Sequence, residues 1–310
     1  MQKFFNFNVL YHKLLSEKTK KRSEDIILTI AIVSFLIHLF IIFLLDFGII
    51  SFNIKSDLLS NPIAAIYTPF SFILVYEVYL LIHYLPKSFT TYIGKQYEII
   101  TLIVIRRLFK DLSNLSLSTD WFKIKYDLQF TYDLIASIVL FFLIYLFYKQ
   151  SKTNYIADVS PKPAVEGVVR FIKIKKIIAT CLVPVFIFVA LYSFTTWFTG
   201  IIKPGLSTDV SFKNINNIFF EQFFTILIIA DVFLLLFSFF HTDEFHKVIR
   251  NSGFIISTIL LRLSFSVSGL LNTVLIVTAI IFGLLILIIH NQFEKQIELE
   301  KTSADKTELT

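Results

Sequence analysis

The sequence predicts an all-α integral membrane protein with eight transmembrane helices, arranged as two parallel four-helix repeats with both termini in the cytoplasm. Three observations support this prediction: long apolar segments, a pattern of an acid and an arginine that occurs twice, and an uneven distribution of Lys and Arg among the loops. The 310-residue chain is 55% hydrophobic and contains 36 Phe but only 8 Gly. Its mean hydropathy of +0.73 is well above that of a soluble domain, so we expect the lipid bilayer to be its main partner.

The predicted spans follow from segment length. A hydrocarbon core of ~30 Å takes about 20 apolar residues of α-helix to cross. Five segments meet this requirement: residues 26–45, 62–85, 177–198, 218–240 and 270–289. A sixth, residues 134–148, is shorter but has apolar residues before it. Two more, residues 97–112 and 253–266, contain arginine, and the number of spans is six without them and eight with them.

An internal repeat favours eight spans. A stretch that contains Glu77 aligns with one that contains Asp231, and the stretch that follows each of them brings Arg106 into register with Arg262. Apolar matches arise easily between segments rich in Leu, Ile and Phe, whereas an acid and an arginine in register do not, so they indicate a repeat. Because each half then has an even number of spans, the two halves are predicted to be parallel.

The repeat divides the chain into five parts. The first part has apolar side chains at helical spacing followed by several lysines, which is typical of a helix lying in the membrane interface. The parts are a cytoplasmic interfacial amphipathic helix at residues 1–22, a first four-helix membrane repeat at 23–148, a cytoplasmic linker at 149–171, a second four-helix membrane repeat at 172–290 and a cytoplasmic polar tail at 291–310.

The orientation follows from the basic residues. Most of the 29 Lys and Arg residues fall in the segments that face the cytoplasm when the N-terminus is inside, and the outer loops contain only Lys55, Lys123, Lys125, Lys203 and Lys213. An excess of Lys and Arg marks the cytoplasmic side. We therefore expect a multi-pass protein of the plasma (inner) membrane. Because the net charge of +6 lies in loops and termini, we expect no nucleic-acid partner.

The opposite charges within the spans are the candidate functional residues. Glu77 lies ~13 Å and Arg106 ~16 Å from the inner ends of their segments, and Asp231 and Arg262 lie at similar depths in the second half. A charge at mid-membrane costs ~2.5–3.5 kcal/mol on insertion scales, and such groups usually face the bundle interior and pair. The sequence therefore predicts two buried ion pairs, Glu77 with Arg106 and Asp231 with Arg262.

Two further residues belong to the candidate site. Arg107 lies about 100° around the helix from Arg106 and has Leu263 at the corresponding position of the second half, so it faces either a water-filled cavity or the interface. His38 lies near the middle of the first long span. It is either a proton relay near neutral pH or a hydrogen-bonded packing residue.

The motifs of common enzymes are not present in the sequence. It contains no Gly-rich phosphate loop, HExxH, GxSxG or Cys/His zinc spacing, and its one cysteine, Cys181, excludes an internal disulfide. We therefore expect a protein that is not an enzyme and that has no cofactor and no metal ligands among the candidate residues.

Two functions fit these features. The first is a channel or transporter for a small ion, in which Glu77 and Asp231 handle a cation or proton, Arg106 and Arg262 are their counter-ions, and His38 adds pH dependence. The second is a non-transporting membrane subunit or scaffold of an envelope complex. In that case the partners are a second copy of the chain or another membrane subunit, and the buried charges only hold helices together.

Overall fold

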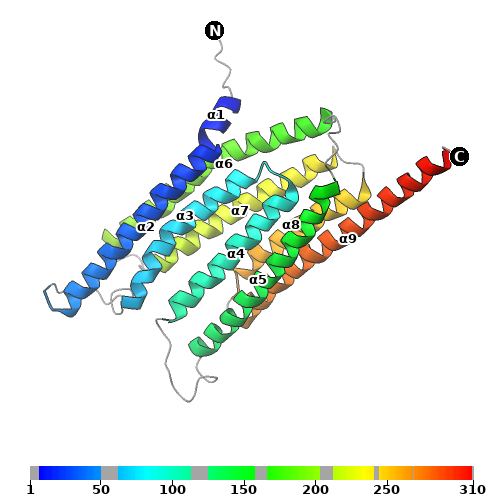
Figure 1. Ribbon diagram of the computed structural model, residues 1–310. Helices are drawn as coiled ribbons and strands as arrows, with labels where there is room; N and C mark the ends of the chain where they lie inside the picture. Colours follow the sequence, from blue (N-terminus) through cyan, green and yellow to red (C-terminus); the bar gives the residue numbers. More distant parts are fainter. Residues whose placement is uncertain are drawn as a thin grey trace, which may run out of the picture. The chain divides into compact units, whose positions relative to one another are not determined.

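The computed structural model describes residues 7–49, 62–112, 125–157, 166–202, 212–240, 244–267 and 269–308. Within these ranges the regular structure is helical (Figure 1). Eight of the helices have 18 residues or more. In chain order the helices are α1 (Phe7–Leu14), α2 (Glu17–Asp46), the 3₁₀ helix Pro62–Ile66, α3 (Tyr67–Tyr84), α4 (Phe89–Leu112), α5 (Lys125–Ala157), α6 (Glu166–Ile202), α7 (Phe212–Phe239), α8 (Phe245–Ser264) and α9 (Leu270–Glu308).

Five helical segments of the described chain are long and apolar enough to cross a membrane. They are Val9–Asp46, Asp127–Ser151, Val169–Tyr192, Gln222–Phe239 and Leu270–Ile297. They coincide with five of the predicted spans, so the protein is a polytopic helical membrane protein. The predicted span at 62–85 contains a shorter apolar helix, Thr68–Tyr84.

The two arginine-containing segments are helical. They form α4 and α8, of 24 and 20 residues. Because of their polar side chains, neither is among the five segments that are apolar enough to cross a membrane. Eight long helices agree in number with the prediction, whereas eight membrane crossings and the internal repeat stay predictions.

The ends of the helices differ from the predicted boundaries. Ser16 caps α2, since its side chain accepts a hydrogen bond from the backbone N–H of Thr19 at 3.1 Å, as Ser does at many helix starts. The helix therefore begins before the boundary predicted at residue 22. At the other end, α9 continues to Glu308 through the predicted polar tail, because Glu, Lys, Gln and Leu favour helix.

Helix contacts divide the chain into two compact units. Unit 1 comprises Met1–Pro86, Leu102–Leu134 and Lys175–Leu227, and unit 2 comprises Lys87–Thr101, Ile135–Ile174 and Ile228–Thr310. Each unit takes helices from both predicted halves, so the units do not follow the predicted repeat boundaries.

Unit 1 is built around the antiparallel pair α2 and α3, which lie side by side (Figure 1). Tyr76 of α3 donates a hydrogen bond to the carboxylate of Glu24 of α2 at 2.9 Å. Many of the apolar side chains of α2 are exposed, among them Ile32 at 60% and Phe40 at 62%. An apolar helix surface of this kind is what contact with lipid requires.

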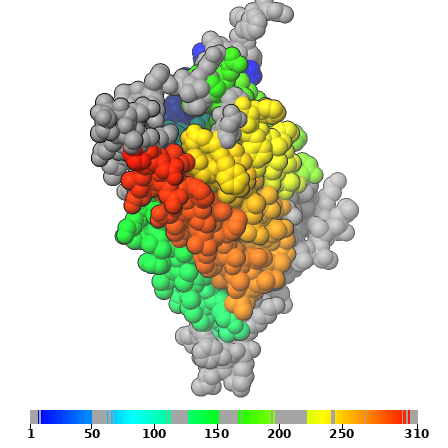
Figure 2. Space-filling view, turned by 90° about the vertical axis from the view of Figure 1, so that its right-hand side faces the viewer, coloured from blue at the N-terminus to red at the C-terminus, as the bar shows by residue number. Residues whose placement is uncertain are grey.

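Unit 2 is built around α8 and α9, which pack closely along their length. The side-chain amide of Asn291 in α9 donates to the backbone carbonyl of Gln150 in α5 at 3.0 Å. The surface of α9, orange to red in Figure 2, accordingly runs beside that of α5, shown in green.

A glycine fixes the approach of α9 to α4 within unit 2. The hydroxyl of Tyr97 in α4 lies 2.7 Å from Ser257 Oγ in α8, and Ser257 Oγ donates to the carbonyl of Ala279 in α9 at 2.7 Å. Because the single hydroxyl proton of Ser257 is used there, Tyr97 is the donor to Ser257. A Cβ at Gly283 of α9 would overlap the hydroxyl oxygen of Tyr97, so only glycine fits at this position.

We expect Gly283→Ala to destabilise unit 2 by ~1–3 kcal/mol, the usual cost of overpacking. Tyr97→Phe removes the oxygen that the new methyl group would strike, so it should restore most of the stability when combined with Gly283→Ala. The free energy of unfolding in detergent, measured for both single variants and the double variant, checks this. Tyr97→Phe by itself should cost ~1 kcal/mol for one lost hydrogen bond. Equal stability of Gly283→Ala and the parent protein would contradict the close approach.

Candidate functional site

The candidate site lies in unit 1, where two adjacent arginines of α4 reach two different neighbouring helices. Arg106 and Arg107 follow one another in the sequence, and one residue turns an α-helix by about 100°. Their side chains therefore leave α4 in different directions. One meets α3 and the other meets α5.

Arg106 forms a buried ion pair with Glu77. Its Nη2 donates to Glu77 Oε2 at 2.5 Å, and its Nη1 donates to the backbone carbonyl of Phe70 at 3.3 Å. Glu77 is 3% exposed and Arg106 is 9% exposed. The structure thus contains the first of the two predicted ion pairs, and this pair ties α4 to α3.

Arg107 forms a second ion pair, which the sequence analysis missed. Its Nε donates to Asp133 Oδ2, and its Nη2 donates to Asp133 Oδ1 at 2.6 Å. Gln129, one turn earlier in α5, also donates to Asp133 Oδ1 at 3.0 Å. Asp133 is fully buried. A guanidinium that engages both oxygens of a carboxylate makes the stronger type of charged hydrogen bond and fixes its geometry.

The reason for missing Asp133 is the position of a helix boundary. The predicted span had its core at residues 134–148, and its extension before residue 134 was argued from apolar side chains alone, so Asp133 was not considered. In the structure α5 begins at Lys125, which places Asp133 more than two turns inside a helix. The spacing of Gln129 and Asp133 was the available signal, because residues four apart lie on the same helix face.

The two ion pairs balance charge inside an apolar helix assembly. Two guanidinium groups and two carboxylates carry no net charge together, and each arginine has an acid on a separate helix. A single buried charge would be costly, whereas a pair with satisfied hydrogen bonds recovers much of that cost. We refer to Arg106, Glu77, Arg107 and Asp133 as the α4 charge cluster.

His38 lies in unit 1 at the contact of α2 and α3. Its Nδ1 is 2.5 Å from the hydroxyl oxygen of Thr68 in α3, and its side chain is partly buried. This contact agrees with the packing role that was one of its two interpretations. The proton-relay role stays a prediction.

The acid of the second predicted pair has a different neighbour. Asp231 of α7 is 1% exposed, and the side-chain amide of Gln96 in α4 donates to its Oδ2 at 3.4 Å. Arg262 lies two residues before the end of α8, where it is partly exposed. Among the ion pairs between described residues, Glu77–Arg106 is present and Asp231–Arg262 is not.

Comparison with known proteins gives no family assignment. No protein-family model matches the chain, and no curated protein or solved structure matches it. The function is therefore inferred from the residues and their arrangement.

We expect Glu77→Gln to lower the free energy of unfolding by ~3–5 kcal/mol, because it leaves the Arg106 guanidinium buried without a carboxylate. Replacing both residues by methionine removes both charges, so the double variant should recover most of that loss. Unfolding in detergent, followed by circular dichroism, measures both effects. Asp25→Asn is the control, since Asp25 is an exposed acid of α2; its loss should change the stability by no more than ~0.5 kcal/mol. A loss for Glu77→Gln no larger than that of the control would contradict a buried pair.

Proposed function

We propose that this polytopic membrane protein is a channel or transporter for a small ion and that the α4 charge cluster lines or gates its path. The observation that carries the proposal is the placement of two adjacent arginines on α4, each joined to an acid from a different helix. Ionisable groups inside membrane helices are rare and commonly mark ion pathways and proton relays. The proposal includes a location in the plasma membrane and no enzymatic activity.

The chemistry of the cluster suits ion handling. Glu77 and Asp133 are the groups that exchange partners: each can hold its arginine, or release it and take a proton or a small cation. Arg106 and Arg107 are the fixed counter-ions, since a guanidinium keeps its charge at all physiological pH values. An ion that binds either acid releases the arginine of that pair, so the freed guanidinium must reach water or another acid, because a buried charge without a partner is costly.

The two acids come from α3 and α5 and not from α4. Movement of either helix can therefore be coupled to ion binding at its acid. A movement of α3 or α5 can separate one acid from its arginine and leave the neighbouring ion pair intact. The separated acid can then bind a proton or a cation. The bidentate geometry of Arg107 with Asp133 and its support by Gln129 make that pair the more rigid one. The pair of Arg106 with Glu77, joined through one guanidinium nitrogen, is the one we expect to open.

Asp231, His38 and Arg262 have secondary places in the proposal. Asp231 is a further buried acid, on α7 in unit 2, and we propose that it also handles a cation or proton. His38 sits on α2 against Thr68 and is proposed to modulate the transport rate with pH. Arg262 is partly exposed, so we propose for it a role at the entrance and not as the counter-ion of Asp231.

Ion flux from proteoliposomes tests the proposal. The purified chain is reconstituted, and proton, Na⁺, K⁺ and Cl⁻ movements are followed under an imposed gradient and voltage. We expect flux from the parent protein that falls to the level of empty liposomes in Glu77→Gln and Asp133→Asn and is reduced in Asp231→Asn. Asp25→Asn is the matched control, because Asp25 is an exposed acid of α2, and its flux should equal that of the parent.

A charge swap separates transport from a purely structural pair. Glu77→Arg combined with Arg106→Glu keeps an ion pair between α3 and α4 but reverses its direction. We expect this double variant to fold and to show altered flux. Unchanged flux in a folded swap variant would contradict a role in the path. No flux from inserted, folded parent protein would contradict the proposal as a whole and favour a non-transporting membrane subunit.

A further inference from the structure

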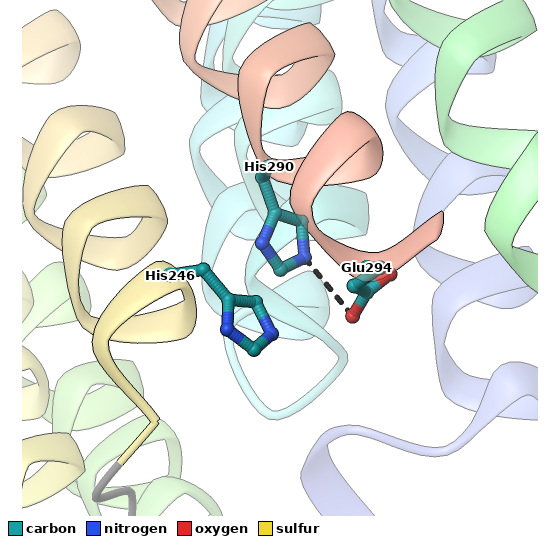
Figure 3. Close-up of side chains that lie close together, drawn as sticks. All are labelled: His246, His290 and Glu294. Atoms are coloured by element: carbon teal, nitrogen blue, oxygen red, sulfur yellow. Dashed lines mark ion pairs between the residues drawn. The ribbon is translucent and has the colours of Figure 1, made fainter. Parts of the chain in front are cut away.

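Two histidines and a glutamate from α8 and α9 come together in unit 2 (Figure 3). His246 is the second residue of α8. His290 and Glu294 are four residues apart in α9, so they lie on one face of that helix. Their potential ligand atoms all lie within 4.8 Å of one another, and Figure 3 shows the three side chains converging between the two helices.

The two imidazoles are held close and largely away from solvent. Their ring centroids are 5.1 Å apart, with an angle of 21° between the ring planes. His246 is 9% exposed and His290 is 2% exposed. His290 Nε2 lies 3.2 Å from Glu294 Oε1, and His246 Nε2 lies 3.3 Å from Glu244 Oε2. Each histidine thus has a carboxylate beside it.

The hydrogen bonds around His290 do not satisfy its ring in either neutral tautomer. Its Nε2 faces both the carboxylate of Glu294, an acceptor, and Nη1 of Arg250, a donor at 2.8 Å. A neutral imidazole nitrogen either donates or accepts, so one of these contacts is always unmatched. Nδ1 is buried and has no hydrogen-bond partner within the described part of the chain. A buried polar atom without a partner requires an explanation, and an imidazole nitrogen is also a good metal ligand.

We propose that His246, His290 and Glu294 form a binding site for a first-row divalent metal ion of the Zn²⁺ type. Two imidazoles and one carboxylate are a donor set that Zn²⁺ uses when it keeps further coordination positions open. Imidazole nitrogen favours Zn²⁺, Co²⁺ or Ni²⁺ over Mg²⁺ and Ca²⁺, which prefer oxygen. Ligands ~2.0–2.1 Å from Zn²⁺ lie closer together than the side chains do here, so side-chain rotations must close the site. Glu244 is the candidate for a fourth ligand.

Arg250 competes with the metal. Its guanidinium contacts His290 and is held by the side-chain oxygen of Asn251, at 3.2 Å from Nε and 3.1 Å from Nη2. A metal ion at either nitrogen of the His290 ring meets this positive charge, and a metal ion at Nε2 also displaces the bond from Arg250. Arg250 therefore weakens metal binding in this arrangement. Removal of the Arg250 charge should therefore make the protein bind the metal ion more tightly.

The site is independent of the proposed ion path. Its three residues, His246, His290 and Glu294, are different from every residue that we propose for the path. Metal binding is measured on the protein in detergent, where no flux occurs. Failure of one proposal therefore leaves the other standing.

The test is metal binding by the purified full chain after treatment with chelator. Zn²⁺ is titrated by calorimetry, and Co²⁺ is added as a spectroscopic probe whose visible absorption reports nitrogen and oxygen coordination. We expect one ion per chain. Loss of an outer-shell partner costs ~10–100-fold in metal affinity, so His246→Ala, His290→Ala and Glu294→Gln, which remove direct ligands, should each cost at least as much. Arg250→Gln should raise the affinity.

The matched control is His83→Ala. His83 is also 2% exposed and also lies beside a glutamate, Glu17, at 3.2 Å, but it belongs to unit 1. Its replacement should leave Zn²⁺ affinity and the Co²⁺ spectrum unchanged. Each variant is checked for folding by circular dichroism, and Glu294→Gln provides the decisive comparison if a histidine variant does not fold. No Zn²⁺ or Co²⁺ binding by the parent protein, equal affinity in Glu294→Gln, or weaker binding in Arg250→Gln would overturn the proposal.

Discussion

The two ion pairs that neutralise Arg106 and Arg107 of α4 are the interaction on which the arrangement of the helices around them depends. A guanidinium in lipid is costly, so both sides of α4 near Arg106 and Arg107 must be covered by helices that present acids. Glu77 of α3 and Asp133 of α5 meet that requirement. The same helix supplies Gln96, Tyr97 and Glu98 to unit 2, where they contact α7, α8 and α5. α4 therefore combines a run of apolar residues with polar side chains near both ends that contact neighbouring helices.

Much of the fold was predictable because lipid restricts what a membrane segment can be. Long apolar runs locate the spans, and their helical form follows from the need to satisfy every backbone group internally. The helix ends were less predictable. The extension of α5 to Lys125 and of α9 to Glu308 depends on polar residues of high helix propensity, which hydropathy does not detect.

The candidate site was predictable only in part. The pair of Glu77 and Arg106 could be predicted, since a charged residue within an apolar segment requires a partner and the two residues lie at similar depth on consecutive helices. Asp133 was overlooked because the residues before position 134 were considered only for their apolar side chains. The contact of Asp231 with Gln96 of α4 was not predictable, because sequence similarity between Arg106 and Arg262 gives no information on which other side chains lie beside Asp231. The histidine cluster of α8 and α9 joins residues 44 positions apart, and only packing brings them together.

The close approach at Gly283 restricts how the helices of unit 2 can move. The Tyr97 hydroxyl occupies the place of a side chain on α9, and Ser257 bonds to both neighbours. Sliding α9 by one turn, or rotating it, would place a bulkier residue against Tyr97 and break the shared hydrogen bonds. The segments of α4, α8 and α9 around this point are therefore tied together by one close contact and two hydrogen bonds. Any relative movement of these three segments would have to break those contacts or carry the segments along together.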